Sequence, residues 1–593
     1  MRMAPKMIRP EDQQPTTQHA GLGGFNGVEL AVFLLLATVV CALTFHFRAA
    51  HFLNTEPRTD QASAARLVQE VRSADHFLPV QRGTNFRTAL EGDSASALYW
   101  IVKYFYSFPN LLFSFWFLLV EIAASFLVGY SYRALVGMSI GVSVLSVGMV
   151  GFWTYWLAVR GNIHSRKHMP MLCGAVGLVS GALSFYGHLY SPWGAHNFGV
   201  FALLVAGLVT TTFLRRLEED PRSITTKGIA TLLIVQAIAF YSHWTILFLL
   251  PPATVLAILL GRRPPLSQRL VMVAAYSGFV ILSTLPVVVL MFSVRTATPA
   301  IVFAGFSNQP SAGIVSAALH RAATWILTSR LYFSIFGLIS AMVGLGMLGF
   351  KRGIWFPLMI VVSHFVVWIS MPGFSWNGSA TETRTYNYLL VYLALGVTYA
   401  VCLPIETFTV SWGARKLVTA AIVVLACLHL GLQLHADQDI EGIGVRIPNF
   451  RDYLNGQGTL RPIIRDINRQ LPRDSFLLTW DYSLQDVYYV LSDAQRAHIL
   501  PAMQTMLLRQ RERDLSDYLR RRAIDVDCGR IYVLSSSSIV PSSLNEATAA
   551  ILGPDGLRCG TTLELNEIAR DAAGPEIFVL YQVVARSDSA LPN

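Results

Sequence analysis

The sequence predicts a polytopic α-helical membrane protein with a C-terminal α/β domain, and three observations lead to this prediction. Of the 593 residues, 53% are hydrophobic and only 14% are charged, whereas soluble domains carry about 25% charged residues. The charges are unevenly distributed, because 38 of them lie in residues 435–593. The preceding part contains repeated apolar runs of about 20 residues, the length that crosses a bilayer. A cytosolic enzyme, a nucleic-acid-binding protein and a disordered scaffold are therefore excluded.

Basic residues between the apolar runs predict the topology. Residues 1–27 contain Arg2, Lys6 and Arg9 and should form a cytoplasmic tail before the first run, Val28–Phe45, because cytoplasmic loops are enriched in Lys and Arg. Residues 28–434 form the predicted transmembrane domain. Its later apolar segments are 171–190, 197–214, 228–243, 244–260, 271–293, 332–350, 354–371, 386–404 and 417–434. Five basic loops all fall on the cytoplasmic side when the spans between them are counted, which places residues 435–593 on the extracytoplasmic side. They begin at Arg160, Arg215, Arg262, Lys351 and Arg415.

Residues 96–132 do not fit this alternation, because a single crossing there would reverse the side of the loop at Arg160. The stretch is either a surface-lying helix with a re-entrant piece or a hairpin that turns near Pro109 and Asn110. The protein then has 11 or 13 spans, respectively. Glu121 lies in this stretch, and an ionisable group in apolar sequence is a candidate functional residue, but the uncertain path leaves its surroundings open.

The first extracytoplasmic loop, residues 47–95, contains an amphipathic segment. Ala64, Leu67, Val68 and Val71 follow helical spacing, and a helix of this kind beside a membrane commonly lies in the interface. The outer loops 294–331 and 372–385 are also longer than simple connectors.

The C-terminal domain, residues 435–593, mixes helix-like and strand-like segments. Residues 461–470 predict a helix, whereas residues 475–480, 530–534 and 577–584 predict strands from their β-branched and aromatic content. Such mixing indicates a small α/β domain. Cys528 and Cys559 both lie in this domain, and an oxidising compartment permits a disulfide between them. The alternative is two buried thiols.

The sequence contains no motif for ATP hydrolysis, dinucleotide binding or serine hydrolysis. Its polar residues concentrate instead in the predicted outer loops and span ends. Acids there can deprotonate a hydroxyl, and arginines can bind a phosphate. The candidates are Arg58, Asp60, Asp93, Trp193, His196, His243, Arg295, Arg384 and Tyr386.

The order of these features resembles the polyprenyl-phosphate-sugar glycosyltransferases of the GT-C fold, near the protein-mannosyltransferase and lipid A aminoarabinose-transferase families. The motifs are an acidic site after the first span, an acid before an aromatic helix, a polar outer turn, an aromatic-Ser-His run, and an Arg-x-Tyr opening a late span. They correspond here to Thr59-Asp60-Gln61, Asp93 in DSASALYW, His188–Asn197, YSHW at Tyr241–Trp244, and Arg384-Thr385-Tyr386. The resemblance covers most of residues 28–434.

This resemblance implies a sugar transferase of the inner membrane that works on its outer face. The donor would be a sugar on a polyprenyl phosphate, and the acceptor an envelope glycan, a glycolipid or a protein. Asp60 would be the general base, with Asp93 as the competing assignment. Arg384, Arg295, His196 and Tyr386 would bind the donor phosphate, and Arg58, His243 and Trp193 the substrate. Many family members have Asp-Glu where this chain has Asp60-Gln61, so a divalent cation site is left open, and His196 replaces the usual arginine of the outer turn.

Simpler interpretations exist for each residue. Asp60 is either a base or a solvated or helix-capping acid, and Asp93 is a favoured N-cap for a helix that starts at Ser94. Arg384 can anchor its span at the interface, and His243 can be an ordinary buried polar residue. The alternative function is a transporter or flippase of lipid-linked substrates, although the sequence lacks the internal repeats that are typical of transporters. A third is a non-catalytic assembly protein.

Overall fold

The computed structural model confirms the polytopic helical architecture and the C-terminal sheet domain. The structure describes residues 27–52, 67–68, 70–72, 74–78, 96–107, 109–128, 132–160, 169–184, 194–221, 224–293, 314–370, 380–407, 414–435, 438–440, 445–447, 463, 466–472, 475–479, 499–501, 528–536, 563–571 and 577–585.

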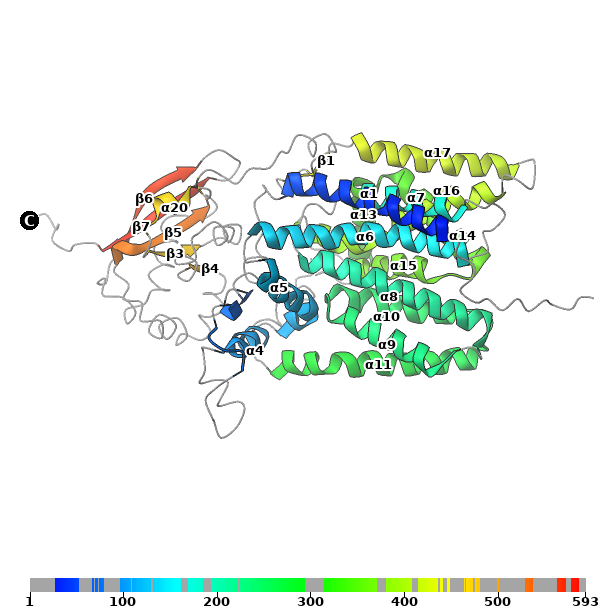
Figure 1. Ribbon diagram of the computed structural model, residues 1–593, viewed down its shortest axis with the longest axis horizontal. Helices are drawn as coiled ribbons and strands as arrows, with labels where there is room; N and C mark the ends of the chain where they lie inside the picture. The colour runs from blue at the N-terminus through cyan, green and yellow to red at the C-terminus, as the bar shows by residue number, and fades with distance from the viewer. Residues whose placement is uncertain are drawn as a thin grey trace, which may run out of the picture.

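Helices that run side by side form the larger part of the molecule (Figure 1). They are α1 (Gly27–Phe52), α6 (Tyr132–Arg160), α7 (Met169–Ser184), α8 (Gly194–Glu219), α9 (Thr226–Phe240), α10 (Thr245–Leu260), α11 (Leu266–Ser293), α13 (Ile314–Phe333), α14 (Ile335–Arg352), α15 (Phe356–Ser370), α16 (Ala380–Thr407) and α17 (Ala414–His435). Among the described residues, six helices are long and apolar enough to cross a membrane, and several shorter apolar helices lie between them. Each apolar segment predicted between residues 171 and 434 overlaps one of these helices.

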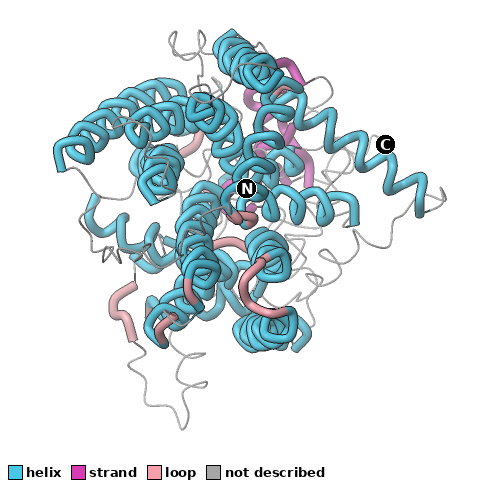
Figure 2. Tube along the Cα trace, turned by 90° about the vertical axis from the view of Figure 1, so that its right-hand side faces the viewer, coloured by secondary structure: helices cyan, strands magenta, loops and turns pink. Residues whose placement is uncertain are grey.

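The bundle has two chemically different ends. At one end, which we call the domain end, α1 stops at Phe52 and α17 stops at His435, next to the C-terminal sheet (Figure 1). At the opposite end, the basic end, α8 stops at Glu219 just after Arg215 and Arg216, and α14 stops at Arg352. Figure 2 looks along the bundle from the basic end, with the strands on the far side.

The described residues 96–107 and 109–128 lie across the domain end. They form α4 (Ala97–Ser107), the 3₁₀ turn η1 (Pro109–Ser114) and α5 (Phe115–Val128), none long enough to span a bilayer by itself. Figure 1 shows α4 and α5 between the bundle and the sheet domain. Of the two sequence alternatives, this arrangement favours the surface-lying helix over the hairpin.

The amphipathic segment of the first loop packs against this surface layer. Leu67, Val68 and Val71 are buried, as their spacing predicts, and Leu67 and Val71 share a hydrophobic cluster with residues of α4 and α5. A backbone hydrogen bond from Ala97 N to His76 O (2.9 Å) ties the end of the segment to α4. The apolar faces of both pieces are thus buried against each other at the domain end.

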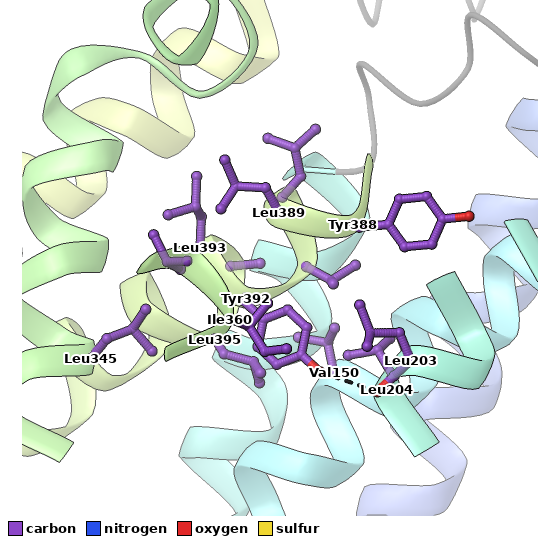
Figure 3. Packing of buried hydrophobic residues seen from close by; sticks show 14 of the residues in the cluster. Val150, Leu203, Leu204, Leu345, Ile360, Tyr388, Leu389, Tyr392, Leu393 and Leu395 are labelled. Atoms are coloured by element: carbon purple, nitrogen blue, oxygen red, sulfur yellow. Dashed lines mark hydrogen bonds between the residues drawn. The ribbon is translucent and has the colours of Figure 1, made fainter. Parts of the chain in front are cut away.

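Helix α16 is the central helix of the bundle. Of the residues in Thr385–Cys402, 94% are buried, and α16 contacts α6, α7, α8, α14, α15 and α17. Figure 3 shows leucines and tyrosines of α16 packed against neighbouring helices. The Tyr392 hydroxyl donates to Leu203 O of α8 (3.1 Å). Small residues let helices approach closely in membranes, and here Gly344 of α14 lies against Gly396 of α16.

The C-terminal domain contains a mixed five-stranded sheet in the order β4-β3-β5-β7-β6. Its strands are β3 (Phe476–Thr479), β4 (Ile499–Pro501), β5 (Ile531–Ser536), β6 (Leu563–Asp571) and β7 (Phe578–Ala585), and a separate pair is formed by β1 (Gln438–Ile440) and β2 (Val445–Ile447). The first three strands pair in parallel, whereas β7 is antiparallel to β5 and β6.

The predicted secondary structure of this domain is largely confirmed. The three predicted strands coincide with β3, β5 and β7, whereas the described helix in the segment 461–470 is only α20 (Ile467–Gln470). Cys528 opens a short 3₁₀ turn, η6 (Cys528–Arg530), but its side chain and Cys559 lie outside the described residues. The disulfide between them stays a prediction.

The close contact between α14 and α16 makes a prediction about Gly344. A Cβ added there would lie 1.9 Å from Gly396 O, whereas a Cβ at Gly346 would meet nothing within 4 Å. Overpacking a tight core costs about 1–3 kcal/mol. Gly344→Ala should therefore lower the thermal unfolding temperature of the purified protein, while the matched Gly346→Ala should not. Equal unfolding temperatures would contradict this packing.

The placement of the basic loops makes a prediction about topology. With the basic end in the cytoplasm, residues after β7 should be extracytoplasmic. An alkaline phosphatase fused after Asn593 should be active, and a fluorescent reporter that folds only in the cytoplasm should be dark. The reverse pattern would overturn the proposed orientation.

Candidate functional site

The sequence-predicted site residues fall into two groups. Arg58, Asp60, Asp93, Trp193 and Arg295 lie outside the described residues, and Arg384 is described only in its backbone, as part of α16. His196, His243 and Tyr386 are described with their side chains. The geometry of the site is therefore built from these three and their neighbours.

Two of the predicted residues, His196 and His243, form a buried pair at the domain end. His196 lies in the first turn of α8, and His243 lies in the short turn between α9 and α10. Their ring centroids are 4.3 Å apart, and their exposed fractions are 4% and 2%. The Nδ1 atom of His243 accepts a hydrogen bond from Thr245 N (3.2 Å). Nδ1 is thus an acceptor, and a neutral His243 carries its proton on Nε2.

Tyr388 of α16 completes this pair into a cluster of three rings. Its ring centroid lies 5.5 Å from that of His243 and 6.1 Å from that of His196. Figure 3 shows its hydroxyl pointing away from the leucines of α16. Gly199 makes room for it, since a Cβ at that position would lie 2.4 Å from the hydroxyl oxygen. The small residue one turn after His196 therefore allows α8 and Tyr388 to meet.

A line of buried polar groups continues from this cluster to α6 and α1. Asn197, next to His196 in the chain, donates from Nδ2 to Ser139 Oγ (2.9 Å). One turn further along α6, Ser143 accepts a hydrogen bond from the Arg48 guanidinium. Arg48 belongs to α1 and is only 3% exposed. The site thus includes a buried positive charge that was not among the sequence-predicted residues.

The 3₁₀ turn η1 and helix α5 cover the turn that carries His243. Trp116 N donates to Tyr241 O (3.2 Å), and the rings of Phe113 and Tyr241 lie 6.0 Å apart. On the neighbouring side, Phe117 contacts Phe198 of α8. Together, η1 and α5 therefore form an apolar layer beside the three rings, which we call the roof.

Glu121 lies on the same roof helix. It is 5% exposed, and its Oε2 atom has no hydrogen-bond partner within the described part of the chain. A carboxyl group buried without a partner is costly. The structure thus answers the question that the sequence left open about its surroundings, because Glu121 is buried at the domain end and not in mid-bundle.

Tyr386 lies in a different cluster. Its hydroxyl donates to Trp325 O (2.6 Å) and also contacts Ser329 Oγ of α13. Trp325 Nε1 in turn donates to His364 Nδ1 (3.1 Å). Residues two apart on a helix point about 200° apart, so Tyr386 faces α13 and α15 while Tyr388 faces the histidines. The geometry makes Tyr386 a residue that fixes α16 against its neighbours.

Arg384 precedes Tyr388 by four positions on α16. Residues at this spacing lie on the same helix face, one turn apart. Arg384 therefore lies one turn before Tyr388 along α16, nearer to the domain end. The Arg-x-Tyr motif assigns Tyr386 to the donor phosphate, and that role stays a prediction, whereas Tyr388 is the tyrosine of α16 that meets the two histidines.

The cluster combines groups that suit an anionic, polar ligand. It offers one guanidinium, two imidazoles, a phenol and an amide at the ends of several apolar helices. No group of three His, Cys, Asp or Glu side chains that could hold a metal ion occurs in the described ranges, and Asp60 lies outside them. The described groups can bind a phosphate.

Comparison with known proteins returns structural similarity alone. No family model and no curated protein matches the chain. Among solved structures, ArnT from Cupriavidus metallidurans in the apo state is similar over 93% of this chain and 97% of that chain, with 12% identity and a TM-score of 0.43. The structure of the same protein bound to undecaprenyl phosphate is similar over 96% of this chain and 100% of that chain, with 12% identity and a TM-score of 0.43.

A second protein, the Archaeoglobus fulgidus oligosaccharyltransferase in complex with Zn and sulfate, is similar over 86% of this chain and 69% of that chain. The identity is 14% and the TM-score 0.38. These names fall within the group that the sequence motifs resemble. At such low scores, the function of this chain has to rest on its own residues.

Proposed function

We propose that this protein is a membrane glycosyltransferase that transfers a sugar from a polyprenyl phosphate to an envelope glycan, glycolipid or protein. The reaction takes place at the domain end, on the outer face of the cytoplasmic membrane. One observation carries the proposal: four parts of the helical bundle bury polar groups at the same end, namely the three rings of His196, His243 and Tyr388, and the guanidinium of Arg48 bonded to Ser143. Buried polar and ionisable groups in membrane helices are costly and commonly functional.

The guanidinium of Arg48 suits the donor phosphate. A lipid-linked donor keeps its chain in the bilayer and its phosphate at the ends of the helices, which is where Arg48 meets Ser143. Arginine binds phosphate through charge-assisted hydrogen bonds. Arg384, one turn before Tyr388 in α16, is the second arginine proposed for this role, with Arg295 and His196 as further ligands. His243, Arg58 and Trp193 would contact the sugar or the acceptor.

The transfer step is an in-line displacement. Asp60 accepts the proton of an acceptor hydroxyl while that oxygen forms a bond to the anomeric carbon of the sugar. The bond between the anomeric carbon and the phosphate oxygen breaks, and polyprenyl phosphate leaves with the electron pair. The arginines stabilise the charge that develops on the phosphate. This geometry inverts the configuration at the anomeric carbon, and the C-terminal domain would help to bind the acceptor.

The location of buried charge favours this proposal over a transporter or flippase. Within the described helices, the buried acidic and basic side chains (Asp, Glu, Lys and Arg) are Arg48 and Glu121, and both lie at the domain end. Transporters place their substrate and ion sites near the bilayer midplane. Here the middle of the bundle is filled by the apolar core around α16.

The proposal is tested first at the general base. Asp60→Asn keeps the shape of the side chain but cannot accept a proton. General-base assistance is worth about 10²–10⁴-fold in rate, so a deletion strain that carries this variant should lose the sugar modification. Mass spectrometry of its envelope glycans and lipids measures the loss.

Asp93→Asn is the matched comparison in the same strain. Normal transfer by Asp60→Asn together with loss by Asp93→Asn would assign the base to Asp93. Normal transfer by both variants would refute the mechanism. An unchanged profile of envelope glycans, lipids and glycoproteins in the deletion strain itself would refute the glycosyltransferase function.

A second test concerns Arg48. Arg48→Gln removes the charge beneath the donor phosphate, and a charge-assisted hydrogen bond is worth about 1.5–3 kcal/mol. We expect the KM for a short-chain polyprenyl-phosphate sugar to rise by roughly 10–100-fold, with partial recovery in Arg48→Lys. Arg216→Gln, an exposed arginine at the basic end, is the control. Unchanged KM in folded Arg48→Gln would remove Arg48 from the phosphate site.

A further inference from the structure

A cavity of about 270 Å³ lies at the basic end, far from the polar cluster of the domain end. It is lined by the last turns of α8, by the loop between α10 and α11, and by the loop between α14 and α15. Its basic lining residues are Arg215, Arg263, Lys351 and Arg352. Drug-sized ligands occupy pockets of about 300–1,000 Å³, so this cavity suits a smaller polar group.

The two acids of the lining are engaged by the protein itself. The Glu218 carboxylate accepts hydrogen bonds from the backbone N–H groups of Arg262 (2.7 Å) and Arg263 (3.2 Å). Glu219 accepts from Arg215 Nε (2.7 Å). These contacts hold the loop after α10 against α8. The lining carries four positive and two negative side chains. The two acidic side chains help to hold the walls of the cavity together.

Two glycines shape this cavity. Gly261 lets the Glu218 carboxylate approach the loop, because a Cβ there would lie 2.5 Å from Oε1. Gly353 has φ +70° and ends α14 in the left-handed conformation, which glycine adopts at little cost. The chain then turns back at once into α15, whose first residue, Phe356, also lines the cavity. The N-terminus of a helix carries a partial positive charge that favours anions.

Three exposed residues next to the lining in the sequence are apolar. Phe350 is 68% exposed, Leu266 57% and Leu260 41%, and the ring of Phe350 packs against Trp355 of the lining at 4.8 Å. Exposed side chains of this kind suit contact with lipid chains, and tryptophan is enriched at the membrane interface. Basic side chains thus line the cavity, and apolar side chains lie on the surface beside it.

We infer that this cavity binds the phosphate headgroup of an anionic phospholipid in the cytoplasmic leaflet. Lys351, Arg352 and Arg263 contact the phosphate, and the acyl chains lie along the exposed residues beside it. Basic pockets between helices on the cytoplasmic side are suited to anionic headgroups. A soluble phosphate compound shares the headgroup chemistry but gains nothing from the apolar surroundings.

The test uses the full-length protein purified in detergent and native mass spectrometry with added phosphatidylglycerol. The probe variant is Lys351→Gln/Arg352→Gln, and the matched control is Arg216→Gln/Lys227→Gln. The control removes two exposed charges from the same end that do not line the cavity. Each basic residue near an anionic surface contributes about fivefold in affinity, so the probe variant should bind phosphatidylglycerol roughly 25-fold more weakly than the control.

Three outcomes would overturn the inference. Equal phosphatidylglycerol binding by the probe and control variants excludes the cavity as the site. Equal retention of phosphatidylcholine and phosphatidylglycerol by the unmodified protein excludes anion selectivity. Displacement of the lipid by millimolar inorganic phosphate indicates a soluble phosphate ligand instead. Matching thermal unfolding of the variants shows that a loss of binding is not a loss of folding. The result is independent of sugar transfer, because none of these residues belongs to the domain-end cluster.

Discussion

The burial of helix α16 is the constraint on which the rest of the structure depends. This helix contacts α6, α7, α8, α13, α14, α15 and α17, and its close approach to α14 relies on the absence of side chains at Gly344 and Gly396. A helix enclosed on all sides has a fixed rotation about its axis, and that rotation decides what each of its tyrosines faces. Tyr392 faces α8, Tyr386 faces α13 and Tyr388 faces the two histidines.

The positions of the helices could be predicted from the sequence because two strong signals agree. Apolar runs give the length of each span, and basic loops give the parity. The segment at 96–132 shows the limit of this method, since its apolar residues pack against the amphipathic segment around Leu67 and Val71. Hydropathy does not distinguish a side chain that faces lipid from one buried against a neighbouring surface helix.

The candidate site was only partly predictable, because the sequence does not show which way each side chain points. The motif pattern found His196 and His243, which are polar residues at the ends of apolar segments. It did not single out Tyr388, because residues that are close together in a motif can point to different sides of a helix, and the role of Tyr386 at the donor phosphate stays a prediction. Arg48 was missed because an arginine near the end of a span usually extends to the interface. Only the packing of α1 on α6 shows that it turns inward to Ser143.

The two ends of the bundle present phosphate-binding chemistry in different surroundings. At the basic end, Lys351 is exposed, so water weakens each electrostatic contact. At the domain end, Arg48 and the two histidines are buried, and the roof of η1 and α5 covers the turn that carries His243. The same charge pair interacts several times more strongly at low effective dielectric than in water. In the reaction that we propose, charge that develops on the leaving phosphate would therefore be stabilised far better at the domain end, whereas the more exposed basic end suits the reversible lipid binding that we infer there.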